Sequence, residues 1–322
     1  MKKVVFYAHH LTLRGTTNAI VDYAQYNQSI LGNESTIIYN AHNSTTNPDM
    51  SSDINLAYKL AKRFNVIAYD AGKDNDFRRL DDIVSKYDVF YFLKAGKPEQ
   101  PDIKSIKTAN HAVFQSNQPH GDRFAYISEW LSTYCSNGTL PYVPHVVNLP
   151  PPNMDLRAKL GIPKDKFVFG RHGGFKTFDI GFVQTAISSV AALDNYVFLM
   201  ANTEKFIDHP NIIYLPSFFG EQEKSNYISA CDAMIHGRKL GESFGLSICE
   251  FLFHNKPVLA WEGGFDKHHV SLLGDRGLLY NEQNIFMKLC HLKSIVGRDF
   301  KRIVDPFTPE KVMAKFDEVF LK

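Results

Sequence analysis

Two glutamates and a short glycine-bearing loop stand out between residues 231 and 264 of this 322-residue chain. A short apolar run at 233–235 leads into a polar loop that contains Glu242, and an apolar pattern with helical spacing follows. A helix beginning near 244–246 would direct unpaired backbone N–H groups and the positive end of its dipole toward a ligand. These donors suit a phosphate group, whereas Glu242 and Glu250, which repel phosphate, suit hydroxyl groups.

A second group of polar residues follows a compact β-rich run at 167–171. Gly170 and Arg171 end this run, and Lys176 lies further along in the loop, with four residues between the two cations. Two fixed cations at the carboxyl end of a strand suit a diphosphate, whose negative charge rises as its bond to a sugar breaks.

Together these patterns resemble the retaining glycosyltransferase group 1 family, which has the GT-B architecture. The family's two glutamates separated by seven residues correspond to Glu242 and Glu250, and its glycine–arginine…lysine signature corresponds to the segment 170–176. Two glutamates at this spacing often arise by chance, but here the surrounding positions match as well. These positions are Phe244, Gly245 and Leu246, then Pro257 and Val258, Gly263 and Gly264, and Gly277, Leu278 and Leu279.

The resemblance implies a hexosyltransferase-type enzyme that moves a sugar from a nucleotide-diphosphate sugar to a hydroxyl acceptor with retention of configuration. Arg171 and Lys176 would clamp the diphosphate, assisted by N–H groups around 244–246. Glu250 would hold the ribose hydroxyls, and Glu242 would hold hydroxyls of the donor sugar. The leaving phosphate would accept the acceptor's proton in a front-face substitution, so no protein nucleophile is required. Arg171 and Lys176 would do the work of a metal ion, so the resemblance implies neither a metal ion nor a cofactor.

The first half of the chain matches the family less closely. The family's glycine-rich loop after the first strand corresponds to the loop around Gly15, where Arg14 is a candidate contact to the acceptor or to a phosphate. The family's cleft-facing histidine corresponds to His111, which would position the sugar or the acceptor unless it is a core histidine. His120 and Asp122 have no counterpart in the family, and a turn is a simpler interpretation of them than a catalytic pair.

Strands and helices alternate along the whole chain, and these elements must position the residues named above. The periodicity predicts strands at 3–8, 35–39, 66–69, 89–93, 111–114, 167–171, 196–200, 211–215, 233–236 and 257–260. It predicts helices at 18–31, 54–64, 77–86, 125–134, 180–192, 221–231, 245–253, 283–296 and 309–320. This alternation predicts an α/β, GT-B-like fold in which two doubly wound Rossmann-like domains face each other across a cleft.

A proline cluster at 142–153 cannot continue a helix or a central strand and therefore predicts a hinge. We place an acceptor-side domain at 1–148 and a nucleotide-sugar donor domain at 149–307. The C-terminal helix, at 308–322, is expected to pack back on the first domain.

Composition excludes several classes of protein. Hydrophobic residues make up 44% of the chain, which excludes disorder as the dominant state. Lys and Arg number 36 against 34 Asp and Glu, so no large basic field is available to attract nucleic acid. The four cysteines lack metal-ligand spacing and suit reduced thiols of a cytoplasmic protein. No apolar run approaches the 18 residues that a transmembrane helix needs.

Two further clusters have simple interpretations. The adjacent histidines at 9–10 and 268–269 point apart and lack a third ligand, so no metal site is expected. A basic stretch could contact the surface of an anionic membrane or a charged acceptor, although a solvated surface is the simpler interpretation. It contains Lys94, Lys97, Lys104 and Lys107.

The sequence leaves the acceptor open: it could be a glycan, a lipid-linked molecule, a protein or a small molecule. It also leaves two other functions open, which are a nucleotide-sugar epimerase of the same architecture and a non-catalytic nucleotide-sugar-binding protein. Glycoside hydrolysis has less support, because one glutamate before a helix and one within it do not obviously face each other across a bond.

Overall fold

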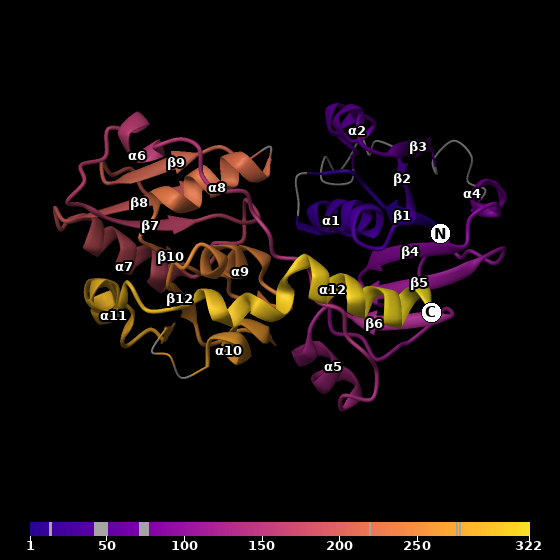
Figure 1. Ribbon diagram of the computed structural model, residues 1–322. Coiled ribbons are helices and arrows are strands. Elements are labelled where there is room, and N and C mark those ends of the chain that lie inside the picture. The colour runs from indigo at the N-terminus through magenta and orange to yellow at the C-terminus, as the bar shows by residue number, and fades with distance from the viewer. Residues whose placement is uncertain (13–14, 42–50, 71–76, 219, 275, 277) are drawn as a thin grey trace. The chain divides into compact units, whose positions relative to one another are not determined.

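The computed structural model describes residues 1–12, 15–41, 51–70, 77–218, 220–274, 276 and 278–322, which form two compact units (Figure 1). One unit comprises Met1–Val146 and Pro309–Lys322, and the other comprises Val147–Thr308. Each unit holds a six-stranded parallel sheet with helices packed on it. The prediction of two doubly wound α/β units is therefore confirmed.

The sheet of the first unit has the strand order β3-β2-β1-β4-β5-β6. Its strands are β1 (Lys3–Ala8), β2 (Glu34–Asn40), β3 (Asn65–Tyr69), β4 (Val89–Lys94), β5 (Lys107–Ala112) and β6 (Arg123–Tyr126). Its helices are α1 (Gly15–Ser29), α2 (Ile54–Leu60), α4 (Phe77–Val84), α5 (Glu129–Ser136) and α12 (Pro309–Phe316), which continues into a π-helical turn, η4 (Asp317–Leu321).

The core of the first unit is built on both faces of β4, whose six residues are all buried. On one face, the Tyr91 ring packs against Tyr23 of α1 and Phe316 of α12, with centroids 5.6 and 5.2 Å apart. Helices α1 and α12 lie side by side on this face (Figure 1). On the other face, Phe92 packs in a cluster with Leu80 of α4. Burial on both faces explains the continuous apolar run that predicted this strand.

The sheet of the second unit repeats the same topology, with the order β14-β12-β10-β7-β8-β9. Its strands are β7 (Phe167–Arg171), β8 (Tyr196–Ala201), β9 (Ile212–Leu215), β10 (Ala233–Ile235), β12 (Val258–Trp261) and β14 (Leu279–Tyr280). Two short strands, β11 (Gly241–Glu242) and β13 (Asp266–Lys267), pair separately. The helices are α6 (Leu156–Lys159), α7 (Gly181–Ala191), α8 (Glu221–Ala230), α9 (Leu246–Phe253), α10 (His268–Leu273) and α11 (Ile285–His291), with 3₁₀ turns η2 (Leu292–Ile295) and η3 (Lys301–Phe307).

The predicted elements between 107 and 136 are partly wrong. Strand β5 starts at Lys107, four residues before the predicted strand at 111–114. The helix predicted over 125–134 begins only at Glu129, because the preceding residues form β6 and pair with β5. The Ser128 side chain accepts a hydrogen bond from the Leu131 backbone N–H, and this N-cap fixes the start of α5.

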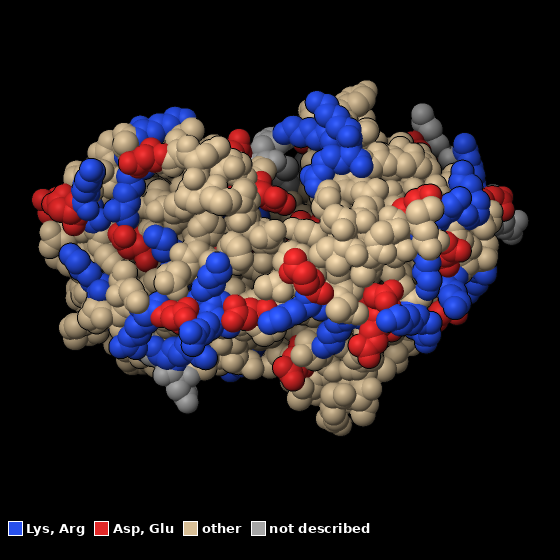
Figure 2. All heavy atoms as spheres, in the orientation of Figure 1, with Lys and Arg blue, Asp and Glu red and all other residues tan. Residues whose placement is uncertain are grey.

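Charged side chains of both signs are intermixed over the face shown in Figure 2. This distribution agrees with the near balance of 36 basic and 34 acidic residues in the sequence. Among the helices that the structure describes, none is long and apolar enough to cross a membrane.

Gly170 marks a close approach between β7 and the helices that cover it. A Cβ atom at this position would lie 2.4 Å from the Cys231 Sγ and 2.8 Å from a ring carbon of Phe251 in α9. Neither distance leaves room for a methyl group. Only glycine therefore lets α9 lie this close to the central strand.

We predict that Gly170→Ala lowers the free energy of unfolding by about 1–3 kcal/mol, because the added methyl group overpacks the core. Urea denaturation measures this change. Gly181→Ala is the matched control, because a Cβ at the first position of α7 meets nothing within 4 Å. A Gly170→Ala protein as stable as the wild type would show that β7 and α9 are not packed this closely.

Candidate functional site

The candidate site lies where the winding of the second sheet reverses. Strands β7 and β10 are neighbours at the centre of the sheet. From β7 the chain continues to β8 on one side, and from β10 it continues to β12 on the other. Ligands of doubly wound sheets bind at the carboxyl ends of the strands at such a reversal. Here Lys176 lies in the loop that follows β7, and Glu242 ends the short strand β11 that comes next after β10.

The amino end of α9 supplies backbone donors to this edge. Gly245 precedes the helix with a φ of 82°, a conformation that suits glycine. The first N–H groups of the helix, from Leu246 onward, have no acceptor within the helix. The Phe244 side chain points away and is 2% exposed; its ring stacks on His268 at 5.3 Å and contacts Phe307. Phe244 therefore anchors the turn, while the backbone after it faces the site.

Glu242 sits in this edge with both carboxylate oxygens partnered. Its Oε1 lies 3.3 Å from His236 Nε2, and its Oε2 accepts a 3.0 Å bond from Arg238. Its backbone N–H donates to His269 Nδ1, and the opposite nitrogen of His269 lies 2.8 Å from the Trp261 carbonyl oxygen. Burial alone would raise the pKa of Glu242, but these cationic and histidine neighbours lower it.

Glu250 lies deeper and is 4% exposed. Its Oε1 accepts a 2.5 Å bond from the Lys224 ammonium of α8, and its Oε2 lies 3.2 Å from His172 Nε2. Burial would raise the pKa of this carboxyl, but Lys224 and His172 outweigh burial and hold the pKa at about 2. Glu250 is therefore ionised and held in one orientation at the centre of the unit.

Arg171 joins two loops through its guanidinium group. One terminal nitrogen, Nη1, donates to the Asn202 carbonyl at 2.8 Å and to Thr203 Oγ1 at 2.7 Å. The other, Nη2, donates to the Gly174 carbonyl and to Thr177 Oγ1, both at 2.8 Å. The side chain is 3% exposed, and burial lowers its pKa to about 10, which keeps it charged at neutral pH.

The expected role of Arg171 as a direct clamp on a diphosphate stays a prediction, and these bonds give it a structural role as well. Its four terminal N–H groups donate to protein acceptors, so of its five donors only the Nε–H has no acceptor among the described residues. Arg171 thus ties the loop at 173–177 to the end of β8. Lys176, at the tip of that loop, is exposed, and among the described residues no hydrogen bond or ion pair holds its ammonium group. Gly170, expected at the donor, lies instead in the core described above.

The predicted site residues of the first unit do not gather at one place. His111 is fully buried; its Nδ1 lies 2.6 Å from the Tyr91 hydroxyl and its Nε2 lies 3.2 Å from the Tyr126 carbonyl oxygen. Burial lowers its pKa to about 3. The expectation that His111 faces a ligand is therefore not met, and its other interpretation, a core histidine, fits its contacts. Gly15 is the exposed first residue of α1.

Two positions singled out in the sequence fall outside the described residues. These are Arg14, the candidate contact beside Gly15, and Gly277, in the matched glycine–leucine–leucine run. Within the described part of the chain, no group of three or more His, Cys, Asp or Glu side chains is placed to hold a metal ion.

Several residues that shape the site carry no sequence signal of their own. Lys224 and His172 meet Glu250 from elements far away in sequence, and His236 and Arg238 flank Glu242 from the loop before it. His269, one of the two adjacent histidines at 268–269, accepts a hydrogen bond from the Glu242 backbone N–H. Only the fold brings these side chains to the two glutamates.

Comparison with known proteins identifies the fold. No protein-family model and no curated protein matches the sequence. A glycosyltransferase from Rickettsia africae has a similar structure, with a TM-score of 0.72 and 14% identity over 99% of this chain and 97% of its own. HepE from Anabaena, solved with UDP-glucose, has a TM-score of 0.74 and 12% identity over 99% of both chains. A sucrose-phosphate synthase from Thermosynechococcus elongatus has a TM-score of 0.64 and 14% identity over 98% of this chain and 95% of its own. At such identities the likeness establishes the fold, which is the GT-B fold of glycosyltransferases.

We predict that acid weakens the stability that Glu250 gains from Lys224 and His172. The folded-state pKa of Glu250, about 2, lies below the ordinary value of 4.5, so the ionised carboxylate contributes to the free energy of unfolding at neutral pH. The wild type loses this contribution as pH falls from 4.5 toward 2. The loss should reach roughly 2 kcal/mol at pH 3. Glu250→Gln should be less stable than the wild type at pH 7, and the gap should shrink at pH 3. Urea unfolding at both pH values measures it, and a gap that is unchanged would contradict the pairing.

Proposed function

We propose that this protein is a retaining glycosyltransferase that moves a sugar from a nucleotide-diphosphate sugar to a hydroxyl acceptor. One observation carries the proposal: an exposed Lys176, without an ion-pair partner among the described residues, and the amino end of α9 follow neighbouring strands at the reversal point, in the unit that holds the ionised Glu242 and Glu250. Cationic and N–H donors suit a diphosphate, and fixed carboxylates suit the hydroxyl groups on either side of it.

The diphosphate would be held by Lys176 and by the N–H groups from Leu246 onward. Both donors stabilise the negative charge that develops as the bond between sugar and phosphate breaks. Arg171 acts as a positioning residue, because it fixes the loop that carries Lys176. We propose that these groups suffice without a divalent metal ion, so transfer should proceed in the presence of a chelator.

The two glutamates would orient the ends of the donor. Glu250 would accept hydrogen bonds from the ribose hydroxyls while Lys224 and His172 keep it charged and in place. Glu242, of which 17% of the side chain is exposed, would accept bonds from hydroxyls of the sugar. In a front-face substitution the leaving phosphate takes the acceptor's proton, so no protein nucleophile is required.

The similar structures support a starting point for the donor. HepE was solved in complex with UDP-glucose and with UDP. UDP-glucose is therefore the first donor to test on this chain, followed by other UDP-sugars and by GDP, ADP and dTDP sugars.

We predict that Lys176→Ala lowers kcat for sugar transfer by about 10²–10³-fold with the fold intact, because one preorganised donor to the developing charge is lost. Release of nucleoside diphosphate, measured with and without an acceptor, gives the rate. Lys164→Ala is the matched control, because Lys164 is an exposed lysine on a loop of the same unit. Arg171→Ala should lower both the rate and the melting temperature, as befits a residue that acts through the loop.

Three outcomes would contradict this proposal. A Lys176→Ala variant that transfers sugar at the wild-type rate would remove the proposed role of the cation. An epimeric sugar nucleotide formed without an acceptor would identify an epimerase. Nucleotide affinity without turnover of any donor would identify a binding protein, since a fold does not by itself prove activity.

A further inference from the structure

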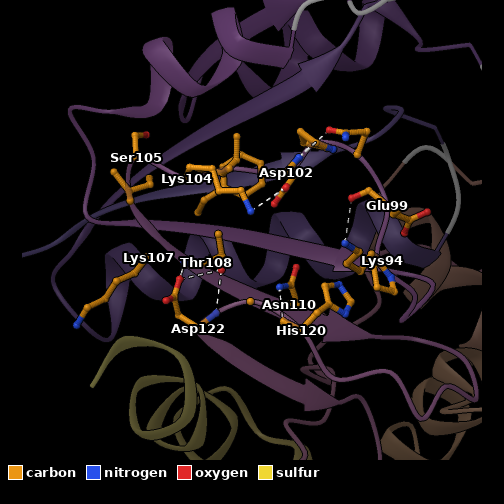
Figure 3. Close-up of a pocket in the computed structure, with 17 residues that line it drawn as sticks. Lys94, Glu99, Asp102, Lys104, Ser105, Lys107, Thr108, Asn110, His120 and Asp122 are labelled. Atoms are coloured by element: carbon orange, nitrogen blue, oxygen red, sulfur yellow. Dashed lines mark hydrogen bonds and ion pairs between the residues drawn. The ribbon is translucent and has the colours of Figure 1, made fainter.

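A groove in the first unit is lined by residues of two segments, 94–108 and 120–122, that have no role in the proposed donor site. The connection between β4 and β5, residues 95–106, contains no helix and passes over the sheet. Beneath it lies a cavity of about 870 Å³, with β5 and the turn at 120–122 forming the opposite wall (Figure 3). We call this cavity the β4–β5 groove. Its volume falls within the roughly 300–1,000 Å³ typical of ligand sites.

The groove combines both signs of charge without an excess of either. Its charged side chains, apart from His120, are Lys94, Lys104 and Lys107 together with Glu99, Asp102 and Asp122. Apolar side chains complete the walls, among them Phe90, Pro98, Pro101 and Ile103. This balance disfavours a multiply charged ligand, because three carboxylates would repel an anion and three ammonium groups would repel a cation.

Lys94 is a poorly satisfied polar group of the groove. It ends β4, is 5% exposed, and donates only one long hydrogen bond, of 3.4 Å, to the Glu99 carbonyl. Its ammonium lies over the Phe92 ring at 4.7 Å. An ammonium group has three donors, so two have no acceptor among the described residues. Burial lowers the pKa of Lys94, and the carboxylates of Glu99 and Asp102 oppose that shift.

The floor of the groove offers a hydrogen-bond acceptor, the Oδ1 atom of Asn110. Asn110 is 6% exposed, and its Nδ2 donates to the His120 carbonyl at 2.9 Å. Within the described residues, nothing donates to its Oδ1. Asp122 accepts bonds from both the backbone N–H and the hydroxyl of Thr108, at 2.8 and 2.9 Å, and these bonds fix the turn beside the groove. His120 and Asp122 thus belong to a turn that forms one wall of the groove.

One end of the groove reaches the edge of the sheet where ligands bind. Strands β1 and β4 are the central pair of the first sheet, at which its winding reverses, and Lys94 is the last residue of β4. The groove runs from this carboxyl edge along β5 toward Lys107 at its amino end (Figure 3). An elongated ligand can therefore lie along β5 with one end at the ligand-binding edge.

We propose that the β4–β5 groove binds a neutral oligosaccharide, the acceptor of the transferase, with one end at Lys94. Sugar hydroxyls both donate and accept hydrogen bonds, so they can accept from the Lys94 ammonium and donate to Asn110 Oδ1 and the Glu99 carboxylate. The apolar side of a sugar ring suits the proline and isoleucine walls. The role as acceptor rests on the function proposed above, whereas the binding of a saccharide does not.

The test is a glycan array that carries neutral and anionic oligosaccharides, probed with the full-length protein in the absence of donor. We expect at least one neutral oligosaccharide to bind, and calorimetry then gives its Kd. Lys94→Met keeps the length of the side chain and removes the ammonium, so it should raise that Kd about tenfold or more. Lys97→Met is the matched control, because Lys97 is an exposed lysine of the same connection and does not line the groove.

The melting temperature separates a binding role of Lys94 from a structural one. Replacing a poorly paired buried charge with an apolar group of similar shape is neutral or stabilising. Lys94→Met should therefore melt at or above the wild-type temperature while it loses affinity. A variant that loses both stability and affinity would indicate a structural lysine and overturn the proposal.

The remaining outcomes are equally decisive. A wild type that binds no neutral oligosaccharide, or binds only anionic ones, would overturn the proposal, as would an unchanged Kd for Lys94→Met. If the wild type binds a neutral oligosaccharide but transfers no sugar to it from any donor, the groove stands as a saccharide site and its role as an acceptor site is lost.

Discussion

Each sheet reverses its winding at one pair of neighbouring strands, and this constraint decides where the chain can bind a ligand. In the second unit the pair is β7 and β10, and the segments that follow them bear Lys176 and Glu242. In the first unit the pair is β1 and β4, and β4 ends in Lys94. The donor site and the saccharide groove proposed here are thus built on equivalent positions of two copies of one topology.

Charge compensation gives these sites their chemical character. Glu250 is buried and Glu242 is partly buried, and each is held ionised by cationic or histidine neighbours, which offsets the cost of removing a carboxylate from water. Lys176 and Lys94 differ, because neither ammonium meets a carboxylate among the described ion pairs. In the proposed function the paired charges hold ligand-binding groups in place, and these two cations are the groups that meet the ligand.

The sequence predicts the parts of this structure that depend on local patterns. The alternation of strands and helices and the segment from Glu242 to Glu250 are local, so the fold class and the helix that begins after Gly245 could be read directly. The environment of a side chain is not local. Nothing in the sequence distinguishes a buried His111 from a ligand-facing one. Nothing in it shows that the Arg171 guanidinium donates to a carbonyl group some 30 residues away.

The most direct test of the central claim is calorimetric titration with UDP, GDP, ADP and dTDP in the presence of a chelator. The account predicts that one nucleotide binds the wild type and that Glu250→Ala weakens its binding, because the ribose loses its acceptor. Glu282→Ala, which changes an exposed glutamate of the same unit, should bind like the wild type. Failure of all four to bind, or equal binding by Glu250→Ala, would contradict a nucleotide-sugar site at the end of β7 and β10.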